Sequence, residues 1–274
     1  MKSELCIYDL ATKEVRVVLR TNRHIEAPNW TPDGSALIVN GQGRLFRVVL
    51  DAPSLDLMDT GAAVRLNNDH GISPDGEWLF LSDKCVVDGE SVIHRCRMDG
   101  SDLHRLTPEF PSYWHGVSPD GLTIAYVGRR DGSYDIYTRP IAGGPETRLT
   151  FDFDHCDGPD YTPDGQWIWF NGERDGTVEL WRMRPDGSDL EKMTEDRSIN
   201  WFPHPSPDGE HMLYIAYPEG TLGHPGGLDV ELRMLPQEGG ETYGLVKLWG
   251  GQGTINVPCW APDSSAFAFM RFEP

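Results

Sequence analysis

Histidines are concentrated in one repeated segment of this chain. Five of its nine histidines lie three to eight residues before a recurrent proline: His24, His70, His115, His155 and His204. Imidazole binds transition metals and exchanges protons near neutral pH. Four of the six repeated segments have proline four residues before the recurrent proline, whereas two neighbouring segments have His70-Gly71 and His115-Gly116 there. Because imidazole replaces a rigid residue twice, we predict that His70 and His115 share one ligand site.

Acidic, basic and aromatic residues accompany these histidines. Arginine suits an anionic ligand, and flat aromatic rings suit the faces of sugars. We predict that the ligand-binding residues are His70, His115, Trp114, Glu26, Asp69, Asp157, Trp201, Arg130 and Arg174. A divalent metal (Mn, Zn or Ca) is a candidate cofactor, with ligands from His70, His115, His155 and His204. Two structural alternatives remain open. The histidines could form hydrogen bonds with the backbone only, and the arginines could form ion pairs with neighbouring side chains only.

The elements that must position these residues form a repeat. A turn of the type Ser73-Pro74-Asp75-Gly76 occurs five times, and a looser sixth copy has Ser264 in place of the glycine; the prolines of the six copies are 42, 45, 44, 44 and 55 residues apart. A fixed period of this size is typical of a repeat architecture. Proline sets φ for the turn, and glycine accepts the left-handed conformation that closes it. We therefore interpret the six aspartates of these positions as turn residues: Asp33, Asp75, Asp120, Asp164, Asp208 and Asp263.

The ends of the chain carry complementary halves of one repeat. Residues 4–8 and 15–19 form a predicted hairpin before the first turn, and residues 256–260 and 266–272 form two predicted strands at the other end. Four strands per repeat is the natural count. The sequence therefore predicts an all-β, six-bladed β-propeller of four-stranded antiparallel blades, in which N-terminal strands pair with C-terminal strands to close the last blade. Residues 1–274 would form a single domain.

Two repeats are especially alike. Residues 124–137 and 168–181 both show a strand, an Arg-Asp-Gly turn and a second strand, and their last strands end Leu149-Thr150 and Met193-Thr194. This pattern resembles the TolB-like six-bladed β-propellers over nearly the whole chain. The resemblance implies the fold, but relatives differ in task. Some bind protein partners, and the oligogalacturonate lyases cleave acidic sugars with the help of a metal.

Composition limits the partners and the compartment. Lys and Arg number 24 and Asp and Glu number 43, which gives a formal charge of −19. A field of this sign repels phosphate backbones, so we expect no nucleic-acid binding. The opening residues show no signal-peptide pattern, and no stretch is long enough to span a bilayer, so we expect a cytoplasmic protein without membrane association. The five cysteines lack paired metal spacing and are predicted to be reduced, buried thiols.

These features favour a binding protein. We expect a cytoplasmic TolB-like propeller that binds a small anionic or carbohydrate-derived ligand, or a protein partner, on the face where the histidine segments meet the central channel. The alternative is a metal-dependent enzyme resembling the oligogalacturonate lyases. In that case a metal held by His70 and His115 would acidify a proton beside a uronate carboxylate, and an arginine would neutralise the carboxylate.

Overall fold

The computed structural model describes residues 2–84 and 89–273. All regular secondary structure in these residues is β-strand, and none of them belongs to a helix long and apolar enough to cross a membrane. The chain divides into two compact units. The first unit comprises Met1–Trp114 and Gly253–Pro274, and the second comprises His115–Gln252. The single domain over residues 1–274 stays a prediction.

The first unit contains three antiparallel sheets. Two of these sheets have a short outer strand, β6 or β10, of only two residues. One sheet consists of β3 (Glu26–Trp30), β4 (Ala36–Gly41), β5 (Arg44–Val49) and β6 (Asp56–Leu57). The next consists of β7 (Leu66–Ile72), β8 (Trp78–Lys84), β9 (Ser91–Arg97) and β10 (His104–Arg105). The third consists of β1 (Ser3–Asp9), β2 (Val15–Thr21) and β23 (Ala266–Phe272).

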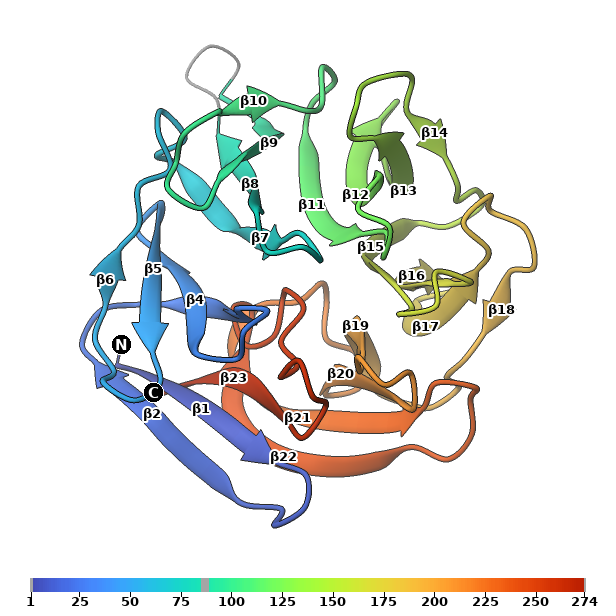
Figure 1. Cartoon of the computed structure of the whole chain (residues 1–274). Helices are drawn as coiled ribbons and strands as arrows, with labels where there is room; N and C mark the ends of the chain where they lie inside the picture. Colours follow the sequence, from blue (N-terminus) through green and yellow to red (C-terminus); the bar gives the residue numbers. More distant parts are fainter. Residues whose placement is uncertain (1, 85–88, 274) are drawn as a thin grey trace. The chain divides into compact units, whose positions relative to one another are not determined.

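The N-terminal hairpin joins the C-terminal strand. Strand β1 pairs antiparallel with β23 from Ser3 opposite Phe272 to Asp9 opposite Ala266, and it lies between β2 and β23 (Figure 1). The predicted pairing of the two ends is therefore confirmed. The predicted strand at residues 256–260 is wrong, because that segment forms only an isolated bridge from Trp260 to Phe267. Pro258 cannot donate a ladder hydrogen bond there.

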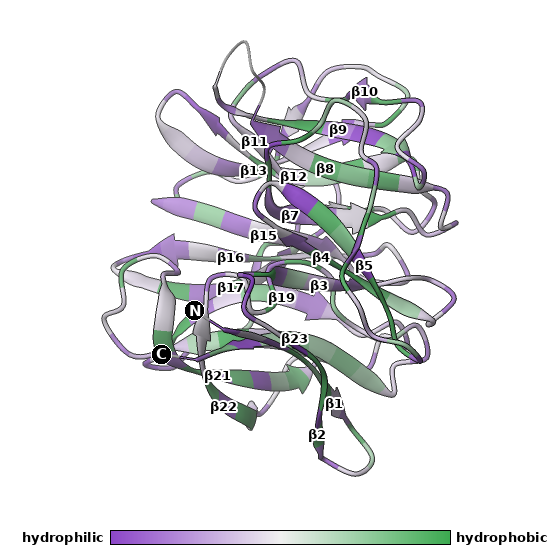
Figure 2. Ribbon diagram, turned by 90° about the vertical axis from the view of Figure 1, so that its left-hand side faces the viewer, coloured by the Kyte–Doolittle hydropathy of each residue, from purple (hydrophilic) through white to green (hydrophobic). Residues whose placement is uncertain are grey.

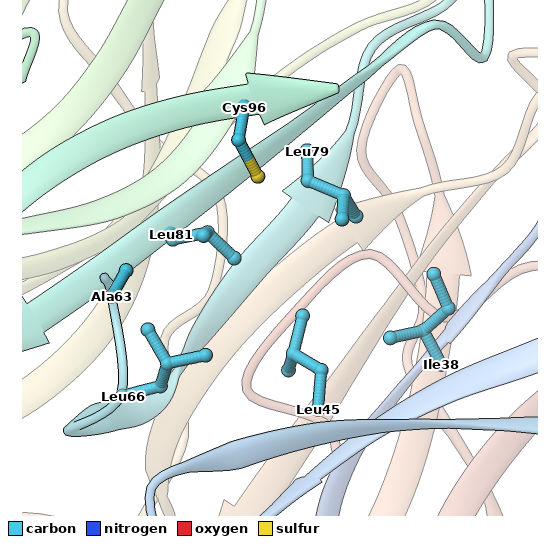
Figure 3. Close-up of a cluster of buried hydrophobic side chains, with 7 residues drawn as sticks. All are labelled: Ile38, Leu45, Ala63, Leu66, Leu79, Leu81 and Cys96. Carbon is cyan, nitrogen blue, oxygen red and sulfur yellow. The ribbon is translucent and has the colours of Figure 1, made fainter. Parts of the chain in front are cut away.

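The core of the first unit lies between neighbouring sheets. Ile38 and Leu45 of one sheet pack with Leu79, Leu81 and other apolar residues of the next (Figure 3). Strand β8 supplies much of this apolar surface, and the adjacent β7 is partly hydrophilic (Figure 2). Burying apolar surface stabilises the folded state by about 25 cal/mol per Å². Such clusters therefore make the main favourable contribution to the free energy of folding. The apolar packing of β8 thus positions the polar residues of the neighbouring strand β7.

The second unit contains the best-matched repeats. Strand β11 (Ser112–Val117) runs from the first unit into it. The remaining strands are β12 (Thr123–Arg130), β13 (Ser133–Pro140), β14 (Thr147–Arg148), β15 (His155–Tyr161), β16 (Ile168–Arg174), β17 (Thr177–Met183), β18 (Glu191–Lys192), β19 (Ile199–Pro205), β20 (His211–Tyr217), β21 (Gly226–Pro236) and β22 (Tyr243–Gly251). Trp169, Leu180 and Tyr214 belong to a buried cluster that packs β16 and β17 against β20.

The described strands form five sheets. One of them has eight strands, because Tyr134 of β13 pairs in parallel with His155 of β15 and joins two groups of four. The group β2-β1-β23 has three strands instead of the expected four. An all-β repeat architecture is therefore observed, but the sheets do not give six separate blades.

The recurrent turns have the expected structure. In each, the aspartate accepts a backbone N–H from the residue two positions later; for example, Ser35 donates to Asp33 at 3.1 Å and Glu77 to Asp75 at 3.0 Å. The other four aspartates repeat this contact. Their interpretation as turn residues is confirmed.

The cysteines also follow the prediction where the structure describes them. Cys6, Cys96, Cys156 and Cys259 are buried, and no disulfide joins these four residues. Burial raises the pKa of Cys6 and of Cys96 to about 11. Cys85 lies outside the described residues.

Candidate functional site

Bulges shape the strands that carry the candidate residues of the second unit. The pairing of β15 with β16 shifts between Asp157 and Asp160, and the pairing of β19 with β20 shifts between Trp201 and His204. A bulge bends its strand and re-aims the side chains beside it. Phe202 lies in the second bulge at φ 54°, a conformation that non-glycine residues seldom adopt. Such local strain is often found at functional sites.

Asp157 is the centre of a group of imidazoles, which we call the Asp157 cluster: Asp157, His115, His155 and His224. The Asp157 Oδ1 atom lies 2.9 Å from His115 Nε2 and accepts the Gly158 N–H at 2.7 Å. The Oδ2 atom lies 3.6 Å from His224 Nε2 and 3.8 Å from His155 Nε2. The His155 and His224 side chains are 28% and 25% exposed and Asp157 is 12% exposed, so the cluster is recessed but reachable from solvent.

Burial and charge oppose each other in this cluster. Burial would raise the pKa of Asp157, but the nearby His115, His155 and His224 hold that pKa well below its usual value. Burial would lower the pKa of His155, but Asp157 raises it overall. For His224, burial prevails and lowers the pKa. The cluster therefore combines a carboxylate with imidazoles that differ in their affinity for protons, an arrangement found at functional sites.

Aromatic rings enclose the cluster. The Trp201 ring lies 4.4 Å from the His224 ring and 5.6 Å from the His155 ring. Tyr134 stacks on His155 with ring centroids 4.8 Å apart. Trp201 is wholly buried and supports the two histidine rings from the core, whereas Tyr134 is partly exposed beside them. The predicted residues His115, Asp157, Trp201 and His155 are thus brought together.

His204 belongs to a neighbouring pair. Its Nδ1 atom lies 3.1 Å from Asp160 Oδ2, and both side chains are buried. Burial raises the pKa of Asp160 although His204 opposes the shift. This predicted metal ligand therefore contacts a different carboxylate from His115 and His155.

The two arginines of the predicted site have structural partners. Arg130 forms a bidentate ion pair with Glu146, with Nε–Oε1 and Nη2–Oε2 distances of 2.9 Å. Arg174 donates from Nε to the Asp152 carbonyl at 3.1 Å and lies over the Phe153 ring. The structural alternative for these residues is thus observed, and the anion-binding role stays a prediction.

His70 belongs to the first unit, where it is fully buried. Its Nδ1 atom lies 3.1 Å from the Asn68 carbonyl oxygen. Burial lowers the pKa of His70 to about 4. Because His115 belongs to the second unit, a site shared by these histidines stays a prediction. In the structure His70 is a neutral, buried group in its own unit.

The acidic candidates of the first unit contact local partners. Glu26 Oε1 lies 3.0 Å from His24 Nε2. Asp69 is buried and accepts a hydrogen bond from Asn67 Nδ2 at 2.7 Å. The pair of His24 and Glu26 occupies the same repeat position as His155 and Asp157. A histidine–carboxylate pair is therefore built into both units.

Packing explains the glycines that follow His70 and His115. Trp114 is buried and stacks on Phe80 at 5.6 Å, and a Cβ atom on Gly71 would lie 1.9 Å from the Trp114 ring. A Cβ atom on Gly116 would lie 2.8 Å from the Pro159 carbonyl oxygen. These glycines are therefore required by the packing of neighbouring protein atoms. Trp114 serves here as a core residue.

The predicted metal ligands do not form one set. Within residues 2–84 and 89–273, no group of three or more His, Cys, Asp or Glu residues is arranged to hold a metal ion. In the second unit the ring nitrogens of His115 and His204 are directed instead at Asp157 and Asp160.

His224 is the cluster residue that the predicted site omits. It lies in the connection between β20 and β21, away from the repeated histidine position. Its signal in the sequence is the length of that connection, residues 218–225, whereas the corresponding connections after β12 and β16 are residues 131–132 and 175–176. An extended loop in one repeat is a recognisable mark of function.

Known proteins resemble this chain throughout its length. Residues 111–225 match the family model described as TolB beta propeller domain. An uncharacterized protein of Agrobacterium fabrum, Atu1656, is 46% identical over 275 residues, which cover 100% of this chain and 94% of that protein. A solved structure from Agrobacterium tumefaciens, provisionally named TolB, has a TM-score of 0.97 at 45% identity and covers 100% of this chain and 99% of that chain.

A more distant structure shares the fold alone. An oligogalacturonate lyase in complex with manganese has a TM-score of 0.57 at 17% identity, covering 82% of this chain and 66% of that chain.

Proposed function

This chain belongs to the TolB-like β-propeller family, and we propose that it is a six-bladed member that binds a small polar molecule at the Asp157 cluster. The ligand would be anionic or derived from a carbohydrate. Six recurrent turns support the number of blades. We also infer a cytoplasmic setting, which the buried thiols of Cys6, Cys96 and Cys156 support.

The convergence of three imidazoles on one recessed carboxylate supports this proposal. Their Nε2 atoms lie 2.9, 3.6 and 3.8 Å from Asp157 oxygens. A buried charge is costly unless it is paired, so such a group is seldom retained for packing alone. Recessed polar groups favour a small molecule over a protein partner, which would need a broad contact surface.

Metal-assisted elimination on an acidic sugar is the alternative function. The observation in its favour is the chemistry of the Asp157 cluster, since imidazole and carboxylate both bind transition metals, but in the described residues they are not arranged to hold a metal ion. Metal analysis of the purified protein separates the two functions. A stoichiometric transition metal that is lost in His115→Ala would favour the lyase.

A thermal-shift screen of small polar metabolites tests the proposal. A compound that binds the folded protein raises its melting temperature. We expect hits on the unmodified protein that disappear in Asp157→Asn, which keeps the size of the side chain but removes its charge. His104→Gln is the matched control, because His104 forms an exposed pair with Asp102 at 2.7 Å. Equal shifts in Asp157→Asn and the control would place binding elsewhere.

A further inference from the structure

The two oxygens of Asp157 differ in their contacts. Oδ1 accepts the Gly158 N–H at 2.7 Å and lies 2.9 Å from His115 Nε2. Oδ2 faces His224 Nε2 at 3.6 Å and His155 Nε2 at 3.8 Å, which are beyond the hydrogen-bond range of about 2.7–3.2 Å. Polar atoms held at such distances are commonly bridged by another polar group. Oδ2 therefore keeps the capacity to accept a hydrogen bond from a ligand.

The second ring nitrogen of His224 determines what the first can do. Its Nδ1 atom contacts Gln252 Oε1, an oxygen that can only accept. In the neutral tautomer that matches this contact, Nδ1 carries the hydrogen and Nε2 is an acceptor. Two acceptors, Asp157 Oδ2 and His224 Nε2, thus face each other at 3.6 Å. A group with hydrogens to donate would satisfy both of them.

The third atom of this arrangement is His155 Nε2. The His155 ring is fixed by stacking on Tyr134 at 4.8 Å and by an edge contact with Trp201 at 5.6 Å. Imidazole can donate or accept at this nitrogen. Beside it, the partly exposed Tyr134 offers a ring surface of the kind that packs against the apolar faces of other molecules, whereas Trp201 is wholly buried.

We propose that Asp157 Oδ2, His155 Nε2 and His224 Nε2 bind neighbouring hydroxyl groups of a neutral sugar or polyol. One hydroxyl donates to Asp157 Oδ2 and exchanges a hydrogen bond with His155, and the next donates to His224. This assignment rests on the proposed function, because it concerns the same site, and it narrows the ligand class. The Asp157 carboxylate opposes an anion here, and the Arg130 guanidinium is paired with Glu146.

The connection at residues 218–225 supplies His224 and would cover the bound hydroxyls. Beyond the contact with Asp157, the His224 ring lies 4.4 Å from Trp201 and 5.1 Å from Phe202. Leu222 in the same connection is 88% exposed. Core packing therefore does not determine the position of Leu222. His224 is thus assigned as a ligand-contacting residue that only this repeat provides.

Isothermal titration calorimetry with two panels of probes tests the assignment. The neutral panel is D-glucose, D-galactose, D-mannose and myo-inositol, and the anionic panel is D-glucuronate, D-galacturonate and inorganic phosphate. We expect binding of at least one neutral probe, with a Kd in the millimolar range or below. His224→Phe and Asp157→Asn should each weaken that binding at least about tenfold, the effect of losing one good hydrogen bond.

Two further variants keep the test decisive. Replacing residues 218–225 by Asp-Gly, the turn at residues 131–132, removes His224 without changing Asp157 and should weaken neutral binding equally. His104→Gln should bind like the unmodified protein. Binding of the anionic panel alone, strengthened in Asp157→Asn, would overturn the hydroxyl assignment but leave the proposed function standing. If neither panel binds at about 100 mM, far above the millimolar range, both are overturned.

Discussion

Histidines in this protein differ in their pKa according to what they face. In the Asp157 cluster, Asp157 opposes the effect of burial and raises the pKa of His155. At His70 no carboxylate is among the causes, and burial lowers the pKa to about 4. Histidines in the segments before the recurrent prolines can thus have a raised or a lowered pKa. The difference lies in neighbours that are remote in the sequence.

Acid should destabilise the protein through His70. Its folded pKa of about 4 lies below the unfolded value of about 6.5, so the unfolded state binds more protons between these pH values. The stability is fully present above pH 6.5 and is lost as the pH falls toward 4, by at most about 3 kcal/mol. Urea unfolding at pH 7 and pH 5 should show a smaller loss for His70→Gln than for the unmodified protein. Parallel losses in both proteins would contradict the pKa shift.

Gly71 should be intolerant of a side chain. A Cβ atom would lie 1.9 Å from the Trp114 ring, so Gly71→Ala should lower the free energy of unfolding by about 1–3 kcal/mol through overpacking. Gly226→Ala is the control, because the nearest atoms to its Cβ lie 3.8 Å away. Trp114→Leu should also destabilise the protein, and the double variant should lose less than the sum of the two single losses, which would show the coupling of the two positions. Equal unfolding energies for both alanine variants would refute the packing role.

At the scale of elements, the hairpin β1–β2 links the ends of the chain. Strand β1 is buried between β2 and β23, and Leu5, Cys6 and Ile7 are almost wholly inaccessible. A strand in this position satisfies the backbone groups of both neighbours and covers their edges. The N-terminal residues are therefore required by a sheet whose other half is encoded at the C-terminus.

Deleting residues 1–20 should disrupt this sheet. The truncated chain exposes one edge of β23, so we expect aggregation or the loss of cooperative unfolding. Lys2→Ala is the control, because it removes only an exposed ion pair with Glu273 at 2.9 Å. Thermal melting followed by circular dichroism measures both. A truncated protein that melts as sharply and at the same temperature as the control would refute the shared sheet.

The sequence predicted those elements that depend on local residues. Turns such as Ser73 to Gly76 repeat in register, so the strands beside them and the pairing of the chain ends could be inferred. The bulge that places Asp157 could not, because it depends on how β15 pairs with β16. The pairing of Arg130 with Glu146, sixteen positions along the chain, likewise depends on how β12 and the strands beside it are folded. The long connection that carries His224 can be recognised in the sequence, but its contact with Asp157 cannot, because the two residues are far apart along the chain.

At the scale of the whole molecule, charge limits the partners. The formal charge of −19 surrounds the protein with a negative potential. Many of the cations whose contacts are described pair with carboxylates or lie over aromatic rings, as Arg182 does with Glu191 and Trp167. A neutral ligand can approach such a molecule without an electrostatic penalty.

Nucleic acids should therefore not bind. We expect no association with duplex DNA or RNA in fluorescence anisotropy at physiological salt, because binding depends on cations that displace counterions from phosphates. A supercharged basic protein serves as the positive control. Sub-micromolar affinity with a steep dependence on salt would contradict this expectation.

The Asp157 cluster as the ligand site is the central claim, and a crystal structure of the protein with the strongest compound from the thermal-shift screen tests it most directly. We predict that the compound contacts the exposed edges of His155 and His224, with one of its polar atoms about 2.7–3.0 Å from Asp157 Oδ2. A compound bound elsewhere, for instance in the pocket of about 570 Å³ lined by Arg233, Lys247 and Trp249, with the Asp157 cluster unchanged, would contradict the account.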